Sequence, residues 1–258
     1  MDWPIRLAST DFDGTLFCEF DDPPFPNELQ EVLAEFQADG GKWAINTGRD
    51  LASLLEELAR CRVTVQPDYV VAVEREIHVR EGSQFKPHVR WNAECTAKHE
   101  YLAQEMQDDL PAMTAWIRNN SRASVFADVY SPLAIVATSN DEMDEIQSRI
   151  LMMTESIAHV AWMRNDVYAR ICHADYSKGT ALMELQRMTG IGPEEVFVIG
   201  DHLNDLAMLD PSVANFISVP ANSVPEVKEH VSSIGGRISE FSHGQAVANE
   251  LRWLKIHG

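Results

Sequence analysis

The chain has 258 residues, of which 45% are hydrophobic, and its formal net charge is −19 at pH 7. It is long enough to bury one large core or two modest ones, and its acidic balance disfavours nucleic acids and anionic membranes as partners. Because no apolar run approaches about 20 residues, no basic start leads into an apolar segment, and the four cysteines lack paired spacing, we expect a cytoplasmic protein with reduced thiols.

The first predicted element is a short buried strand at Ile5–Ser9, and an acidic loop follows it. The loop contains Asp11 and Asp13, with Gly14 allowing a sharp turn. In an open parallel sheet, ligands bind at the carboxyl ends of the strands. There, one carboxylate can act as a nucleophile while the other transfers a proton. A plain turn is the alternative interpretation of the loop by itself.

Strands and helices alternate in the next segment. A helix begins near Asn27 with an apolar stripe at helical spacing and stops at Gly40-Gly41; the stripe is Leu29, Val32, Leu33 and Phe36. A strand then ends in Thr47-Gly48-Arg49, where the threonine hydroxyl and backbone N–H can donate to a phosphate oxygen. The alternative is a simple strand-to-helix turn with Asp50 as the N-cap. A helix over 50–60 and a strand over 69–73 follow, which predicts a parallel sheet with right-handed crossovers.

A long insert separates this segment from the next chemical motif. Two helices are expected in it, over 96–119 with an interruption at Pro111 and over 141–153. The expected strands cover 76–80, 88–91, 123–127, 133–138, 158–164 and 168–173. Strands and helices without strict alternation predict an α+β module with its own sheet.

Two more motifs follow the insert. Lys178 opens a helix, where its charge is disfavoured by the helix dipole unless it neutralises an aspartate and a phosphate. A buried strand over 196–199 then leads into a loop with Asp201 and Asp205. Asp201 is suited to complete a divalent-metal site with Asp11, and Asp205 to support it. Asn204 could serve as the N-cap of a helix over 205–209.

Four such loops in this order resemble the haloacid dehalogenase superfamily of phosphohydrolases, and in particular its Cof-like and sucrose-phosphatase-like branch. The matching residues are Asp11, Asp13, Thr47, Lys178, Asp201 and Asp205. The resemblance covers roughly residues 5–73 and 167–232. It implies an α/β fold, with a Rossmann-like parallel-sheet core over 1–75 and 174–258 and an inserted α+β cap domain of type IIB over 76–173.

The resemblance also implies a reaction, the hydrolysis of a small phosphorylated metabolite, first of all a sugar phosphate. Asp11 would attack phosphorus and Asp13 would transfer the protons. Mg²⁺ would be held by a set comprising Asp11, Asp13, Asp201 and Asp205, with Asp13 contributing its backbone carbonyl. The phosphate would be bound by Thr47, Gly48, Arg49, Lys178 and Asn204. A phosphomannomutase-like sugar phosphomutase and a non-catalytic phosphate-binding relative remain as alternatives.

The chain departs from the pattern after its third strand. Cof-like members usually carry Asn-Gly there, whereas this sequence reads Glu74-Arg75-Glu76. The departure concerns the floor of the expected pocket and favours the sugar-phosphatase side of the branch.

Overall fold

The computed structural model describes residues 3–257, and the chain divides into two compact units. The first unit joins the two ends of the chain, Met1–Val89 and Ser177–Gly258, and the second is Arg90–Tyr176. The second unit therefore begins later than the cap expected over 76–173. Among the described residues, no helix is long and apolar enough to cross a membrane.

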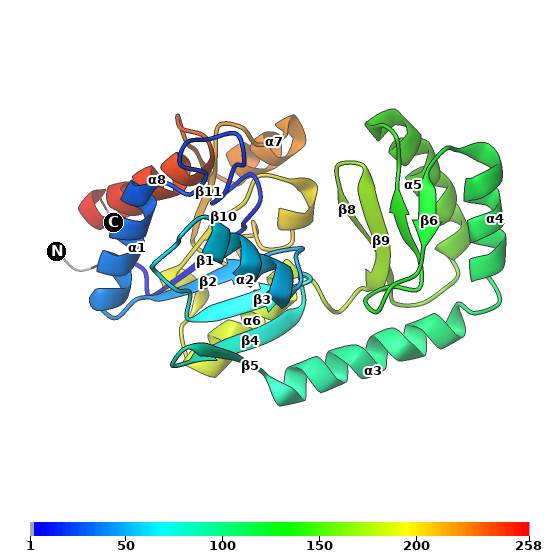
Figure 1. Cartoon of the computed structure of the whole chain (residues 1–258), viewed down its shortest axis with the longest axis horizontal. Helices are drawn as coiled ribbons and strands as arrows, with labels where there is room; N and C mark the ends of the chain where they lie inside the picture. Colours follow the sequence, from blue (N-terminus) through cyan, green and yellow to red (C-terminus); the bar gives the residue numbers. More distant parts are fainter. Residues whose placement is uncertain (1–2, 258) are drawn as a thin grey trace. The chain divides into compact units, whose positions relative to one another are not determined.

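The first unit is built on one eight-stranded sheet with the order β12-β11-β10-β1-β2-β3-β4-β5 (Figure 1). Its strands are β1 (Leu7–Thr10), β2 (Lys42–Asn46), β3 (Tyr69–Ala72), β4 (Glu76–Glu81), β5 (Gln84–Pro87), β10 (Val196–Ile199), β11 (Phe216–Val219) and β12 (Arg237–Ile238). From β12 to β3 neighbouring strands pair in parallel, and β4 and β5 add two antiparallel strands. This sheet confirms the expected α/β, Rossmann-like core.

The helices of this unit follow the apolar patterns of the sequence. They are α1 (Asn27–Ala38), α2 (Leu51–Arg60), α6 (Lys178–Thr189), α7 (Pro225–Ser233) and α8 (His243–His257), with short 3₁₀ turns η1 (Pro193–Glu195) and η2 (Leu203–Asp205). All four members of the α1 stripe are buried, as its spacing predicts. Asp50 is the N-cap of α2, and its side chain accepts a hydrogen bond from the Ser53 backbone N–H. The expected helix over 205–209 is replaced by η2 and turns.

The order in which strands are added to the sheet changes direction at β1, and this determines where the loops that follow the strands come together. From β1 the sheet continues through β2 and β3 on one side and through β10 and β11 on the other. Thr10 is in register with Ile45 of β2 and with Ile199 of β10, so these three parallel strands end side by side. Such a switch point leaves a crevice at the carboxyl ends of the strands.

The second unit has its own antiparallel sheet, ordered β6-β7-β9-β8, and its own hydrophobic core. Its elements are α3 (Val89–Glu105), α4 (Leu110–Asn120), β6 (Ser124–Phe126), β7 (Ala134–Val136), α5 (Asn140–Thr154), β8 (Val160–Asn165) and β9 (Tyr168–His173). Side chains of β7, β9 and all three helices form this core, which includes Leu102, Met113, Ile135, Ile146 and Ile171. The α+β character expected of the insert is confirmed.

Two expectations for the insert were wrong. The segment over 76–80 does form a strand, but β4 pairs with β3 and belongs to the first sheet. The expected strand over 88–91 is wrong as well, because helix α3 begins at Val89. The interruption expected near Pro111 in the helix over 96–119 is present, because α3 and α4 are two helices separated just before that residue.

Candidate active site

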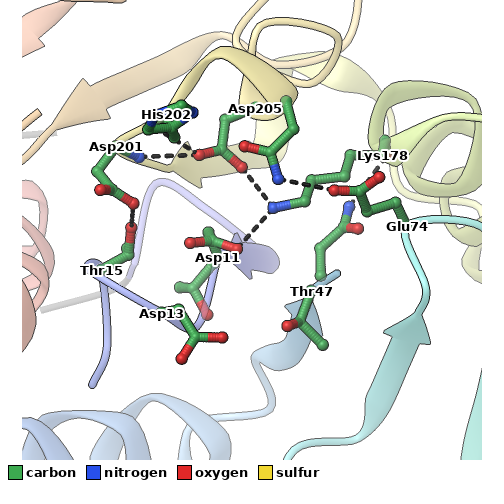
Figure 2. A network of polar contacts seen from close by, with 12 residues as sticks. Asp11, Asp13, Thr15, Thr47, Glu74, Lys178, Asp201, His202 and Asp205 are labelled. Carbon is green, nitrogen blue, oxygen red and sulfur yellow. Dashed lines mark hydrogen bonds and ion pairs between the residues drawn. The ribbon is translucent and has the colours of Figure 1, made fainter. Parts of the chain in front are cut away.

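Polar side chains from four loops converge at the switch point of the first unit (Figure 2). Asp11 follows β1, Thr47 follows β2, and Asp201 lies just beyond β10, while Lys178 is the first residue of α6. The structure thus brings together the residues of all four sequence motifs. They lie within one polar network, although 167 positions separate Asp11 from Lys178.

Lys178 is the centre of this network. Its fully buried Nζ lies 2.6 Å from Asp11 Oδ1 and 2.6 Å from Asp205 Oδ1. Burial alone would lower the pKa of this ammonium, but the charges of Asp11, Asp205 and Glu74 outweigh it and raise the pKa above its usual value. The lysine is therefore cationic at neutral pH, and one of its three N–H donors is left for a ligand.

Gly179 explains how Lys178 reaches this position. A Cβ on Gly179 would lie 1.9 Å from the carbonyl oxygen of Ala207, so only glycine lets the first turn of α6 approach that backbone. Ser177 caps the helix by accepting from the Thr180 backbone N–H. In the Lys-Gly pair of the sequence, the glycine thus allows the close approach that places the lysine ammonium inside the site.

Asp205 organises the loop after β10. Its Oδ1 accepts from Lys178, and its Oδ2 accepts from the backbone N–H groups of Asp201 and His202, both at 2.9 Å. A Cβ on Gly200 would lie 2.4 Å from Asp205 Cγ, so the glycine makes room for this carboxylate. Since both oxygens already accept hydrogen bonds, this geometry favours the supporting role that the sequence indicated over direct metal ligation.

Asp11 and Asp201 both have raised pKa values. Burial raises the pKa of Asp11 well above its usual value, and Lys178 offsets this only in part. Burial, together with the charge of Asp205, raises the pKa of Asp201 to about 6, although its Oδ1 accepts from the Thr15 hydroxyl at 2.9 Å. Both groups lie where a nearby positive charge would favour ionisation.

The donor set fits a magnesium ion. Asp11 and Asp201 each present a carboxylate oxygen, and these two oxygens lie within 4.8 Å of each other and of an oxygen of the supporting residue Asp205. Hard oxygen ligands are those that Mg²⁺ prefers. Gly14 has a φ of +75°, and a Cβ there would lie 2.5 Å from Asp201 Oδ2. This glycine therefore keeps the space beside that oxygen open.

Asp13 has a different environment from Asp11, although only one residue separates them. Arg49 donates to both Asp13 oxygens, from Nε at 2.8 Å and from Nη2 at 2.7 Å, and its Nη1 donates to Glu57 at 3.2 Å. The Asp13 side chain is 43% exposed, whereas that of Asp11 is 8% exposed. Arg49, expected among the phosphate ligands, is here bound to Asp13 and Glu57, with Phe12 beneath its guanidinium. Two carboxylates with separate roles are therefore chemically feasible.

Thr47 is fully buried at the end of β2. Its backbone N–H donates to the Val71 carbonyl at 2.9 Å, and its hydroxyl accepts from the Arg49 backbone N–H at 3.1 Å. The expectation that the Thr47 backbone N–H serves a phosphate was wrong because the β3 carbonyl occupies it. The hydroxyl hydrogen is the donor that Thr47 can offer.

Asn204 and Glu74 meet beside Gly48. The Asn204 Nδ2 donates to Glu74 Oε1 at 2.7 Å, and a Cβ on Gly48 would lie 3.4 Å from the same Glu74 oxygen. Glu74 was not among the expected site residues, and neither was Thr15, whose hydroxyl holds Asp201. The signal for Glu74 was the departure from Asn-Gly after the third strand.

Comparisons with known proteins agree with this architecture. A family model described as haloacid dehalogenase-like hydrolase matches residues 97–251, more than half of the chain. The protein YxeH of Bacillus subtilis (strain 168) is 24% identical over 256 residues, covering 87% of this chain and 90% of YxeH.

Two solved structures share the fold along nearly the whole chain. The sucrose-phosphatase of Synechocystis sp. PCC6803, solved with sucrose and phosphate, has a TM-score of 0.75 at 19% identity and covers 99% of both chains. The subclass IIB sugar phosphatase BT4131 has a TM-score of 0.65 at 17% identity, covering 97% of this chain and 99% of its own.

Proposed function

The chain belongs to the haloacid dehalogenase-like hydrolases, and we propose that within this family it is a magnesium-dependent phosphomonoesterase acting on a small sugar phosphate. One observation carries the proposal. Two nearby aspartates have distinct environments, Asp11 buried against Lys178 and Asp13 held at the surface by Arg49. This is the division that a nucleophile and a proton-transfer group require.

In the first half of the reaction, an Asp11 oxygen attacks phosphorus and the bond from phosphorus to the alcohol oxygen breaks. Asp13 donates a proton to the departing oxygen, and the phosphoryl group remains on Asp11 as an acyl phosphate. In the second half, a water oxygen attacks phosphorus while Asp13 takes its proton. Orthophosphate and free Asp11 result, so both carboxylates return to their starting states.

The remaining residues bind the phosphoryl group. The third N–H of Lys178, the Thr47 hydroxyl, the backbone at Gly48 and the second amide N–H of Asn204 are donors for its oxygens. Asp11, Asp201 and the backbone carbonyl of Asp13 would hold Mg²⁺, which when bound supplies positive charge for the anionic substrate. We assign the substrate-selecting role of a cap to the second unit, Arg90–Tyr176.

A sugar phosphate is proposed as the substrate because the two structural relatives described above are named as sucrose-phosphatase and sugar phosphatase. The test is orthophosphate release from a panel of sugar phosphates and other phosphomonoesters, with Mg²⁺ and with a chelator. Asp11→Asn is expected to abolish release, whereas Asp210→Asn, at an aspartate outside the network, should behave like the wild type.

The alternatives give different outcomes in the same assay. If phosphate is moved within a sugar but not released, a phosphomutase is the correct assignment. If the protein binds Mg²⁺ and phosphate with no turnover of any panel member, it is a non-catalytic relative. In either case the phosphomonoesterase proposal is wrong.

A further inference from the structure

Glu74 is a buried carboxylate that the mechanism above does not use. It is 3% exposed and follows β3 in the turn that leads to β4. Both central residues of this turn are left-handed, Val73 with a φ of +45° and Glu74 with a φ of +65°. Asparagine and glycine adopt this conformation readily, whereas β-branched and long side chains are strained in it. Such strain persists where the surroundings impose it, and it clusters at functional sites.

The surroundings do impose this conformation. The Glu74 backbone N–H donates to the Thr47 carbonyl at 2.8 Å, and the Val73 backbone N–H donates to the Arg49 carbonyl at 2.9 Å. The turn is therefore fastened directly to the Thr47–Arg49 loop. As a result, the Glu74 side chain is placed against the groups that would bind the phosphate, and Figure 2 shows its carboxylate beside the Lys178 side chain.

This carboxylate contacts a donor of the site. Its Oε1 accepts the Asn204 amide at 2.7 Å, while the Asn204 Oδ1 is buried without a hydrogen-bond partner among the described residues. The bond to Glu74 therefore fixes which way the amide of Asn204 faces. Because Asn204 has a second N–H, holding the first one orients the other.

We propose that Glu74 is a positioning residue of this site, orienting the Asn204 amide toward the phosphoryl group from a strained turn. The inference rests on the proposed function, since it concerns donors for the same phosphate. It also explains why the chain keeps a glutamate where the backbone conformation favours asparagine or glycine. A purely structural turn would gain from either replacement.

The test is a substitution that should lower activity without lowering stability. Glu74→Gly removes the carboxylate and relieves the turn, so we expect an unfolding temperature equal to or above that of the wild type. Its kcat/KM should nevertheless fall about tenfold to a hundredfold, the usual effect of losing a hydrogen bond to a charged group. Glu76→Gln, a carboxylate removed from the same hairpin, is the matched control and should leave kcat/KM unchanged.

A double-mutant cycle with Asn204→Ala tests the route of the effect. If Glu74 acts through Asn204, Glu74→Gly should cost clearly less in the Asn204→Ala background than in the wild type. Glu74→Gln keeps an acceptor for the amide but removes the charge, so it should fall between the wild type and Glu74→Gly. Full additivity in the cycle would overturn the inference. So would a fall in the unfolding temperature of Glu74→Gly that accompanies its fall in kcat/KM.

The outcome is separable from that of the proposed function. If the wild type and Glu76→Gln release phosphate while Asp11→Asn does not, the proposed function stands, and an unimpaired Glu74→Gly then refutes the inference alone. If the wild type shows no turnover, the proposed function fails, and binding of orthophosphate with Mg²⁺ by calorimetry becomes the readout. Glu74→Gly should then weaken binding at least tenfold relative to Glu76→Gln, and no such difference would refute the inference as well.

Discussion

Asp201 should make the metal-free protein less stable as the pH rises. Its pKa is raised from 3.8 to about 6 in the folded protein, by burial first and by the charge of Asp205 second. Between about pH 4 and pH 6 the folded state therefore keeps a proton that the unfolded state has lost. Since stability falls with pH wherever the folded state binds more protons, the free energy of unfolding decreases across this window. A shift of about two units corresponds to about 3 kcal/mol.

The measurement compares the wild type with Asp201→Asn, because asparagine cannot ionise. Urea unfolding in chelator at pH 4, 5, 6 and 7 gives the difference in unfolding free energy between the two proteins at each pH. We expect this difference to move against the wild type by about 2 kcal/mol from pH 4 to pH 7, because part of the titration of the unfolded state lies below pH 4. Mg²⁺ at pH 7 should restore the wild type but not Asp201→Asn, because a ligand stabilises only the state that binds it.

Asp210→Asn provides the control. Hydrogen bonds from Ser212 lower the pKa of Asp210, so above pH 4 this carboxylate is ionised in both the folded and the unfolded state. Its difference from the wild type should therefore stay flat over the same range. If the Asp201→Asn difference is equally flat, to within about 0.5 kcal/mol, the carboxylate is not held in the environment described here and the reasoning fails.

Three further substitutions test the network. Lys178→Met should lower the unfolding free energy by about 3–5 kcal/mol in urea denaturation, because two buried carboxylates lose their cation; a smaller loss than about 1 kcal/mol would contradict this. Arg49→Lys should lower kcat about tenfold to a hundredfold, because lysine cannot bind Asp13 in two places, and an unchanged kcat would mean that this clamp has no role. Gly14→Ala should raise the Mg²⁺ concentration needed for half-maximal activity, because its Cβ would meet Asp201. Gly82→Ala, also left-handed but with open space around it, should leave that concentration unchanged.

Much of the first unit could be predicted because its signals are local. The α1 stripe has a helical period and needs no partner to be recognised. The resemblance of the four collinear motifs to a known family then placed Asp11 and Lys178 in one site. Their 2.6 Å contact was not predictable from spacing, since it depends on how closely Gly179 lets α6 approach the backbone of Ala207.

The errors came from segments whose structure depends on distant neighbours. The four residues over 88–91 alternate like a strand, but only the His88 backbone N–H continues the sheet, donating to the Ile77 carbonyl of β4, and the helix formers that follow extend α3 back to Val89. The segment over 76–80 was expected to belong to the insert. A strand that follows β3 through a tight turn instead pairs with it directly, so β4 and then β5 extend the first sheet.

Glu74 shows how a mismatch between sequence and backbone can itself be informative. Its side chain gives no turn signal, and the left-handed conformation it adopts is one that turn propensities assign to asparagine or glycine. In the sequence, this residue stands out only as a departure from a family pattern. The structure supplies its contacts, a hydrogen bond from Asn204 and a place beside Lys178. At this position the backbone conformation that glutamate prefers differs from the one that the fold imposes. In folded proteins such conflicts are expected where function determines which residue is present.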